Sequence, residues 1–219
     1  YVTKQIKSKN RVSYHGEVFT NEQEVNAMLD LVKDETDRIE SRFLEPACGN
    51  GNFLAEILRR KLVRVKRQYT RNNLEYTKNS FLALTSIYGI DILEDNVEEC
   101  RERLFKIWDK DYLTQCKEDI MDEVRTAAKY ILGKNILCGD ALTLLKNDGT
   151  PIVFAQWDFI TGNKIKRRDY TLDALMRVQQ VQMSFDMVGW EYDEEMKEWI
   201  PAPIKEYPLI DFWEVQYAT

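Results

Sequence analysis

The sequence is poor in the residues that build metal centres and membrane spans. It has one histidine, His15, and its four cysteines lie far apart with no Cys-x-x-Cys pair, so a zinc site is not expected. No apolar run approaches the ~18 residues that span a bilayer, and residues 1–5 lack the apolar segment of a secretory signal. These absences predict reduced thiols, a cytoplasmic location, no metal and no membrane partner.

The residues that are present fit a folded and highly charged chain. Of the 219 residues, 44% are hydrophobic and 31% are charged, and the formal net charge is −6. At ~150 residues per domain, this length corresponds to one large domain or to one domain with an appendage. The acidic balance argues against tight DNA binding by this chain alone, and it still allows a local basic patch.

The apolar spacing predicts strands that alternate with helices. Strands are expected at residues 42–45, 87–91, 135–138 and 157–161, with residues 209–215 as a candidate for one more. The expected helices are 20–32 with a capping box at Thr20 and Gln23, 53–67, 97–107, 113–132 with Gly133 as its stop signal, and 171–188, while 68–80 stays ambiguous. This alternation predicts an α/β fold with a mostly parallel sheet covered on both faces, whose ligands bind beyond the carboxyl ends of the strands.

The string F-L-E-P-A-C-G-N-G-N-F-L, residues 43–54, connects the first strand to the next helix. Gly49 and Gly51 let the backbone turn sharply and approach a ligand, and free amides at the helix start favour a carboxylate. A glycine pair alone is just as typical of an ordinary strand–turn–helix connection. The whole string, however, resembles the S-adenosylmethionine loop of class I methyltransferases, and more narrowly that of the restriction-modification DNA N6-adenine methyltransferases. The resemblance implies cofactor contacts for Glu45, Pro46, Ala47, Gly49 and Gly51.

The resemblance assigns three further elements to the cofactor. Thr20 ends a Gly-x-Phe-Thr element that would line the methionine end, with Asn21 where proline is usual. Asp91, followed by Ile92, ends the second strand and would accept hydrogen bonds from the ribose hydroxyls. Asp140 and Ala141 follow the third strand and would contact the adenine. The distance from Gly49 to Asp91 is 42 residues, against the usual ~20, so the chain carries an insertion after the first helix.

Each of these elements also has a plain structural interpretation. Thr20 fits the cap of a helix, Asp91 fits an acid that is stabilised near a helix N-terminus, and Asp140 fits the cap of a short helix. His15 is more typical of a structural or solvated residue than of a catalytic one. The order of the elements along the chain favours the cofactor interpretation.

Residues 158–163 resemble the entry to the Asn-Pro-Pro-Tyr motif of amino-methyltransferases. That motif holds the target amine through the asparagine side chain and a backbone carbonyl, while its aromatic ring stacks on a flipped base. Here Asn163 is present, but residues 164–166 are Lys-Ile-Lys in place of Pro-Pro-Tyr. The resemblance implies Asn163 as the catalytic residue, with Tyr170 as the nearest downstream candidate for the missing ring.

The basic residues fall in two runs, 59–67 and 164–168, which are either solvated surfaces or contacts for DNA phosphates. The resemblance covers residues 12–163, and the 56 residues after Asn163 are too few for a complete sheet with a target-recognition domain. The expected fold is therefore a Rossmann-like doubly wound sheet, the class I methyltransferase fold, truncated on its C-terminal side. Residues 1–16 would form an arm, 17–170 the S-adenosylmethionine-binding core, and 171–219 a helix with an aromatic, acidic tail.

The resemblance implies an S-adenosylmethionine-dependent methyltransferase acting on adenine N6 in DNA, as part of a restriction-modification system. DNA would bind weakly to this chain alone, and a specificity subunit, another subunit of such a system or a second copy would cover the open edge of the sheet. The altered residues after Asn163 and the acidic charge favour an alternative, a catalytically degenerate module that binds the cofactor or a partner. N-methylation of RNA or protein is a third interpretation.

Overall fold

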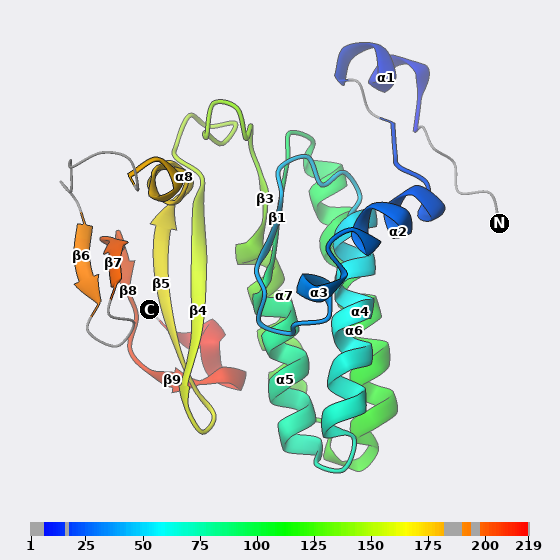
Figure 1. The fold of residues 1–219 in the computed structure, drawn as a ribbon, viewed down its shortest axis with the longest axis vertical. Coiled ribbons are helices and arrows are strands. Elements are labelled where there is room, and N and C mark those ends of the chain that lie inside the picture. Colours follow the sequence, from blue (N-terminus) through cyan, green and yellow to red (C-terminus); the bar gives the residue numbers. More distant parts are fainter. Residues whose placement is uncertain (1–6, 16–17, 182–189, 194–197, 219) are drawn as a thin grey trace.

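The computed structural model describes residues 7–15, 18–181, 190–193 and 198–218 of the chain. In this part the fold is mixed α/β, with helices, a small parallel sheet and an antiparallel sheet arranged as three layers (Figure 1). No helix of the described residues is both long and apolar enough to cross a membrane.

The parallel sheet has three strands in the order β1-β2-β3. They are β1 (Phe43–Glu45), β2 (Ile87–Asp91) and β3 (Ile136–Cys138), and β2 is central because it pairs in parallel with both neighbours. All three confirm the strands that were expected from the sequence. Because the strands are parallel, the loops that follow them meet at one edge, which we call the carboxyl edge.

Four helices connect these strands and cover one face of the sheet. The helices α4 (Asn52–Tyr69) and α5 (Asn73–Thr85) join β1 to β2, and α6 (Glu94–Cys116) and α7 (Asp122–Asn135) join β2 to β3. The ambiguous segment 68–80 is thus mostly α5, whose N-terminus is capped by Asn72. The helix expected over 113–132 is wrong in its bounds, because residues 113–116 complete α6, a 3-10 helix follows at Lys117–Asp119, and α7 begins only at Asp122.

The junction between α7 and β3 depends on the buried side chain of Asn135. Its Nδ2 lies 3.1 Å from the carbonyl oxygen of Ile87, to which it donates, and its Oδ1 accepts from Nε1 of Trp157 at 2.9 Å. Gly133, expected to stop the helix, lies inside α7 instead. The helix ends at Asn135, where the side-chain amide takes over the hydrogen bonding between the helix and the strands.

An antiparallel sheet covers the other face. Its hairpin consists of β4 (Val153–Thr161) and β5 (Lys164–Thr171), and β5 also pairs with the short strands β8 (Lys205–Glu206) and β9 (Ile210–Asp211). The parallel sheet is thus covered on both faces as expected, but one cover is an antiparallel sheet, where a doubly wound sheet would have helices. The strand expected at 157–161 exists, but it is the second half of β4 and belongs to this second sheet.

The direction of β4 decides where its end lies. Ile152, just before β4, lies next to Gly139 at the carboxyl edge, since a Cβ placed on Gly139 would be 2.8 Å from Cδ1 of Ile152. At the other end of β4, Asp158 forms an ion pair of 3.0 Å with Arg42, which precedes β1. The strand thus runs opposite to the parallel sheet and ends at the amino edge.

The core lies between these layers. Alternating residues of β2 face the two sides: Ile87 packs with the helices, whereas Tyr88 and Ile90 pack with Phe154 of β4. The Tyr88 hydroxyl donates to the carbonyl oxygen of Ala155 at 3.0 Å. These contacts fix the antiparallel sheet on the parallel one.

The remaining elements are short. They are α1 (Lys9–His15), α2 (Glu22–Asp30), α3 (Lys33–Thr36), α8 (Leu172–Val181), the hairpin of β6 (Trp190–Asp193) and β7 (Glu198–Pro201), and the 3-10 helices Lys117–Asp119 and Phe212–Tyr217. The cap of α2 is Asn21, whose Oδ1 accepts from the Glu24 amide at 2.9 Å, and not Thr20 as expected. Of the helix expected at 171–188, residues 182–188 lie outside the described part. The candidate strand 209–215 contains the short strand β9, and from Phe212 onward it belongs to the second 3-10 helix.

Candidate functional site

The three loops at the carboxyl edge meet around Asp91. The backbone amide of Gly49, in the loop after β1, donates to Oδ2 of Asp91 at 2.9 Å, although the two residues are 42 positions apart. The amide of Gly139, after β3, donates to the carbonyl oxygen of Asp91 at 3.0 Å. The structure therefore brings together the three elements that the sequence assigned to one site.

The glycines of the first loop are required by backbone conformation and by space. Gly49 has φ +52° and Gly51 has φ +83°, a region that other residues rarely adopt. A Cβ on Gly51 would lie 2.6 Å from Sγ of Cys100, and one on Gly49 would lie 3.1 Å from the Phe19 ring. Gly51 is also the N-cap of α4, so the loop delivers backbone amides to the start of that helix.

The Asp91 carboxylate is held by donors from three directions. Besides Gly49, the amide of Leu93 donates to Oδ1 at 2.9 Å, and Nδ2 of Asn96 donates to the same oxygen at 3.2 Å. A carboxylate has about four acceptor positions. The described residues supply donors to three of them, so a position remains for a ligand hydroxyl on this half-buried group.

Asp140 closes a tight turn after β3. Its Oδ1 accepts from the Leu142 amide at 2.8 Å, and its carbonyl oxygen accepts from the Leu144 amide at 2.8 Å. The residues after Ala141 form turns rather than the short helix that the alternative interpretation required. The turn leaves the Leu142 side chain 94% exposed, and Ile92 of the neighbouring loop is 44% exposed. Apolar surface is therefore available beside Asp140.

The remaining predicted cofactor residues flank the first loop. The carbonyl oxygen of Thr20 accepts from Nδ2 of Asn52 at 2.8 Å, which ties the segment before α2 to the start of α4. Glu45 ends β1, and burial raises the pKa of its carboxyl group. Pro46 and Ala47 form the turn that follows. Thr20 also lines a cleft of about 490 Å³ that extends between α2, α4 and α6.

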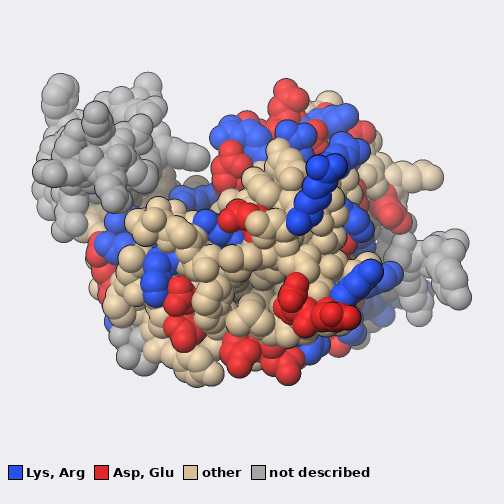
Figure 2. Space-filling model, turned by 90° about the horizontal axis from the view of Figure 1, so that it is seen from below, with Lys and Arg blue, Asp and Glu red and all other residues tan. Residues whose placement is uncertain are grey.

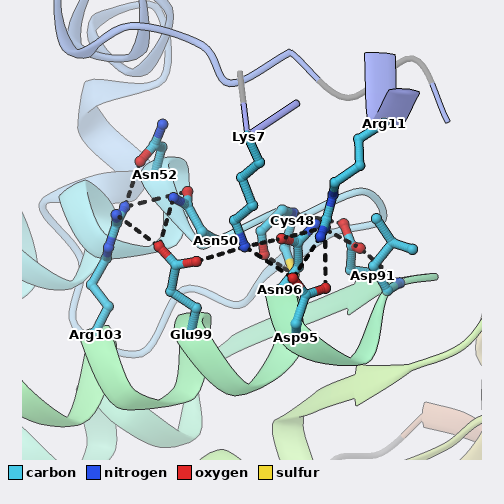
Figure 3. Close-up of polar contacts among 12 residues, drawn as sticks. Lys7, Arg11, Cys48, Asn50, Asn52, Asp91, Asp95, Asn96, Glu99 and Arg103 are labelled. Atoms are coloured by element: carbon cyan, nitrogen blue, oxygen red, sulfur yellow. Dashed lines mark hydrogen bonds and ion pairs between the residues drawn. The ribbon is translucent and has the colours of Figure 1, made fainter. Parts of the chain in front are cut away.

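A cluster that the sequence reasoning missed lies beside Asp91. Lys7 reaches the start of α6, where its Nζ lies 2.7 Å from Oε2 of Glu99 and 2.8 Å from Oδ1 of Asn96 (Figure 3). Arg11 of α1 pairs with Asp95 at 2.6 Å, and its hydrogen bond lowers the pKa of Asp95 to about 2. The available signal was complementary charge, a basic segment at 4–11 and an acidic one at 94–99.

Of the two residues assigned to catalysis, Asn163 lies at the opposite edge and Tyr170 lies in the core. Asn163 lies in the turn between β4 and β5, at the amino edge, where its carbonyl oxygen accepts from the Phe212 amide at 3.0 Å. The nine residues of β4 span about 30 Å at ~3.4 Å each, which separates this turn from Asp91. Tyr170 is 2% exposed and opposite Phe154, so it is a core residue between the sheets.

The basic run 164–168 is already neutralised within the chain. Its cations pair with carboxylates as follows: Lys164 with Asp211, Lys166 with Glu206, Arg167 with Asp169, and Arg168 with Asp158 and Glu206. Figure 2, seen from the lower end of Figure 1, shows basic and acidic side chains interspersed rather than gathered in one patch. This surface does not favour DNA phosphates.

The run 59–67 is divided between structural and exposed cations. Lys61 is fully buried and Arg60 pairs with Asp30 and Glu56. The exposed cations of this run are Arg59, Arg64, Lys66 and Arg67, and of these Arg59 pairs with Glu56 at 3.4 Å.

No protein-family model, curated protein or solved structure matches the chain. Among the described residues, no group of three or more histidine, cysteine, aspartate and glutamate side chains is arranged to hold a metal ion.

Proposed function

We propose that this chain is an S-adenosylmethionine-binding module of the class I methyltransferase type, with the cofactor at the carboxyl edge of the parallel sheet. The parallel sheet has the strand order β3-β2-β1, with helical connections between successive strands. One half of a doubly wound, Rossmann-like sheet has the same order. The single observation that carries the proposal is the Asp91 carboxylate, which links the glycine loop to the start of α6 at the position where such sheets hold a ribose.

The residues at this edge fit the chemistry of the cofactor. A carboxylate with a remaining acceptor position suits a ribose hydroxyl, and the exposed Ile92 and Leu142 suit the faces of an adenine ring next to Asp140. Gly49 and Gly51 occupy positions where a side chain would collide with the loop's neighbours. Thr20, assigned to the methionine end, lies beside the start of α4, and Glu45 ends β1 directly before the loop. When bound, S-adenosylmethionine supplies an electrophilic methyl group.

Adenine N6 methylation in DNA is the second candidate. It is favoured because the motifs that follow the first three strands occur in the order that the resembled family has. In this chain Asn163 lies at the amino edge and Tyr170 is buried in the core, so neither side chain is open to a target amine next to the cofactor. We infer that methyl transfer requires groups from a partner, such as another subunit of a restriction-modification system or a second copy. The cofactor-binding module is therefore the better supported function.

Titration calorimetry with S-adenosylhomocysteine tests this proposal. The wild-type chain is expected to bind one equivalent. Asp91→Ala should weaken binding by about 1–3 kcal/mol, because the glycine-loop amide and the ligand hydroxyl both lose their acceptor. Asp122→Ala, at a carboxylate that is 88% exposed at the start of α7, is the matched control and should bind as wild type does. Absence of heat at millimolar ligand would refute the proposal.

A further inference from the structure

Asn96 lies between the N-terminal segment and the Asp91 carboxylate. Its side chain is buried, with 1% exposure. Nδ2 donates to Oδ1 of Asp91 at 3.2 Å, while Oδ1 of Asn96 accepts from Nζ of Lys7 at 2.8 Å and from Nη2 of Arg11 at 3.1 Å (Figure 3). One amide thus connects two cations of the first eleven residues to the acid at the end of β2.

The two cations determine which way this amide faces. A primary amide has an acceptor end and a donor end, and only the donor end can bond a carboxylate. Lys7 and Arg11 are donors only, so they hold the oxygen of Asn96 on their side and turn its NH₂ group toward Asp91. Without them, a reversed amide would place an oxygen against the carboxylate.

A second route leads from the same cation to the glycine loop. Nζ of Lys7 lies 5.9 Å from the centroid of the Phe19 ring. That ring borders Gly49, whose Cβ position is 3.1 Å from Cε1 of Phe19. Lys7 is therefore linked to both partners of the Gly49–Asp91 hydrogen bond. Phe19 lies between Lys7 and Gly49, and Asn96 lies between Lys7 and Asp91.

We propose that Asn96 is a positioning residue for Asp91, and that Lys7 and Arg11 set the cofactor affinity of this site through it. This proposal rests on the cofactor-binding function proposed above. The ion pairs that hold the segment are partly exposed, with 27% exposure for Lys7 and 54% for Asp95. Salt screens such pairs. The affinity for S-adenosylhomocysteine, a ligand without net charge at neutral pH, is therefore expected to fall as salt rises.

The test is calorimetry on the full chain with S-adenosylhomocysteine in low and high salt. The wild type should lose about five- to tenfold in affinity at high salt, the cost of about one hydrogen bond at Asp91. The double variant Lys7→Ala/Arg11→Ala should have, at both salt concentrations, the affinity that the wild type has at high salt. Asn96→Ala should give the same result as the double variant. The control Lys9→Ala/Lys33→Ala removes two exposed cations to which no bond of this cluster is assigned and should keep the wild-type affinity and salt response.

Conservative variants of Lys7 and Arg11 separate an effect on the position of Asp91 from an effect on the stability of the fold. Lys7→Arg and Arg11→Lys retain a donor to Asn96 and should restore most of the affinity, with the midpoint of thermal unfolding reported for every variant. If the wild type binds, Asp91→Ala weakens binding, and neither salt nor the variants of Lys7, Arg11 and Asn96 has an effect, this inference is overturned while the proposed function stands. If the wild type does not bind, the proposed function itself fails.

Discussion

Trp157 and Asn135 join the two sheets by a buried hydrogen bond of 2.9 Å from the indole Nε1 to the amide Oδ1. Asn135 ends α7 directly before β3, and Trp157 lies in the second half of β4. The bond therefore fixes the end of β4 at the amino edge of the parallel sheet. The turn that carries Asn163 follows from this arrangement, on the side away from Asp91.

The position of Asn163 leads to a first prediction. Asn163→Ala is expected to leave the affinity for S-adenosylhomocysteine unchanged, because the described bond of this residue uses its backbone carbonyl. Calorimetry on Asn163→Ala and Asp91→Ala side by side checks this. A loss of affinity in Asn163→Ala as large as in Asp91→Ala would show that the turn reaches the ligand. That result would contradict the position of this turn at the amino edge.

The glycine loop gives a second prediction, with a built-in comparison. Gly51 and Gly149 have similar φ values, +83° and +79°, but only Gly51 has a neighbour, Cys100, within reach of a Cβ. Alanine at Gly149 should cost about 1 kcal/mol of unfolding free energy, from backbone strain alone. Alanine at Gly51 should cost about 1–3 kcal/mol more, because Sγ of Cys100 must move. Urea denaturation measures both, and equal losses would mean that Cys100 yields without cost.

Buried Lys61 makes stability depend on pH. Its Nζ donates to the carbonyl oxygens of Ile39 and Ser41 and to Oγ of Ser86. Burial lowers the pKa of Lys61 to about 7, whereas in the unfolded chain it titrates near ~10.4. Between these values the unfolded chain binds more protons than the folded one, so the contribution of Lys61 to the free energy of unfolding rises with pH.

We expect this contribution to increase by about 1 kcal/mol from pH 6.5 to pH 8. Lys61→Met should lack that increase and should be less stable at both pH values, since three acceptors lose their donor. Lys66→Met, at an exposed lysine of the same helix, should keep the wild-type pH dependence. Urea denaturation at the two pH values measures the free energy of unfolding of each variant. If this free energy changes equally with pH in the wild type and in Lys61→Met, the role of Lys61 is disproved.

The two basic runs give a prediction for DNA. The triple variant Arg64→Ala/Lys66→Ala/Arg67→Ala should weaken duplex binding and reduce the slope of log affinity against log salt by about 1 to 3, because exposed cations displace counterions. Lys164→Ala/Lys166→Ala should change the slope less, since both lysines pair with carboxylates of the chain. Fluorescence anisotropy with a labelled duplex at several salt concentrations measures both slopes. A larger effect of the second variant would refute this assignment.

The parallel sheet could be predicted because its signals are local. Each of its strands is a short apolar run that ends in a turn or an acid, as at Glu45 and Asp91. The helix α5 was missed because polar residues face its core side. Thr77 and Ser80 are buried there, and Ser80 Oγ accepts from the Trp108 indole at 3.2 Å. A hydroxyl whose partner is 28 residues away leaves no apolar periodicity to detect.

The second sheet was missed for a similar reason. Residues 164–168 have the composition of a basic loop, yet Arg167 is buried in β5. Both of its bonds to the Asp169 carboxylate are 2.7 Å long, and the Tyr207 ring lies 4.1 Å from its guanidinium carbon. Tyr207 is 40 positions away in the sequence. A cation–π contact over such a separation depends on the fold and cannot be derived from spacing.

The candidate site was foreseen in part. The positions of Gly49, Asp91 and Asp140 followed from their places at strand ends, where parallel strands bring loops together. The contribution of Lys7 and Asn96 was not foreseen, because complementary charge in two segments does not specify which side chains meet across 89 residues. The place of Asn163 was misjudged because strand direction, parallel or antiparallel, is not visible in a single strand's residues.

The most direct test of the central claim is an amide NMR titration of the labelled chain with S-adenosylhomocysteine. Binding at the carboxyl edge predicts the largest shift changes at Gly49, Gly51, Leu93 and Leu142, and unchanged amides in the turn at 161–164. No change up to millimolar ligand, or changes confined to that turn, would contradict the assignment of the cofactor to the carboxyl edge.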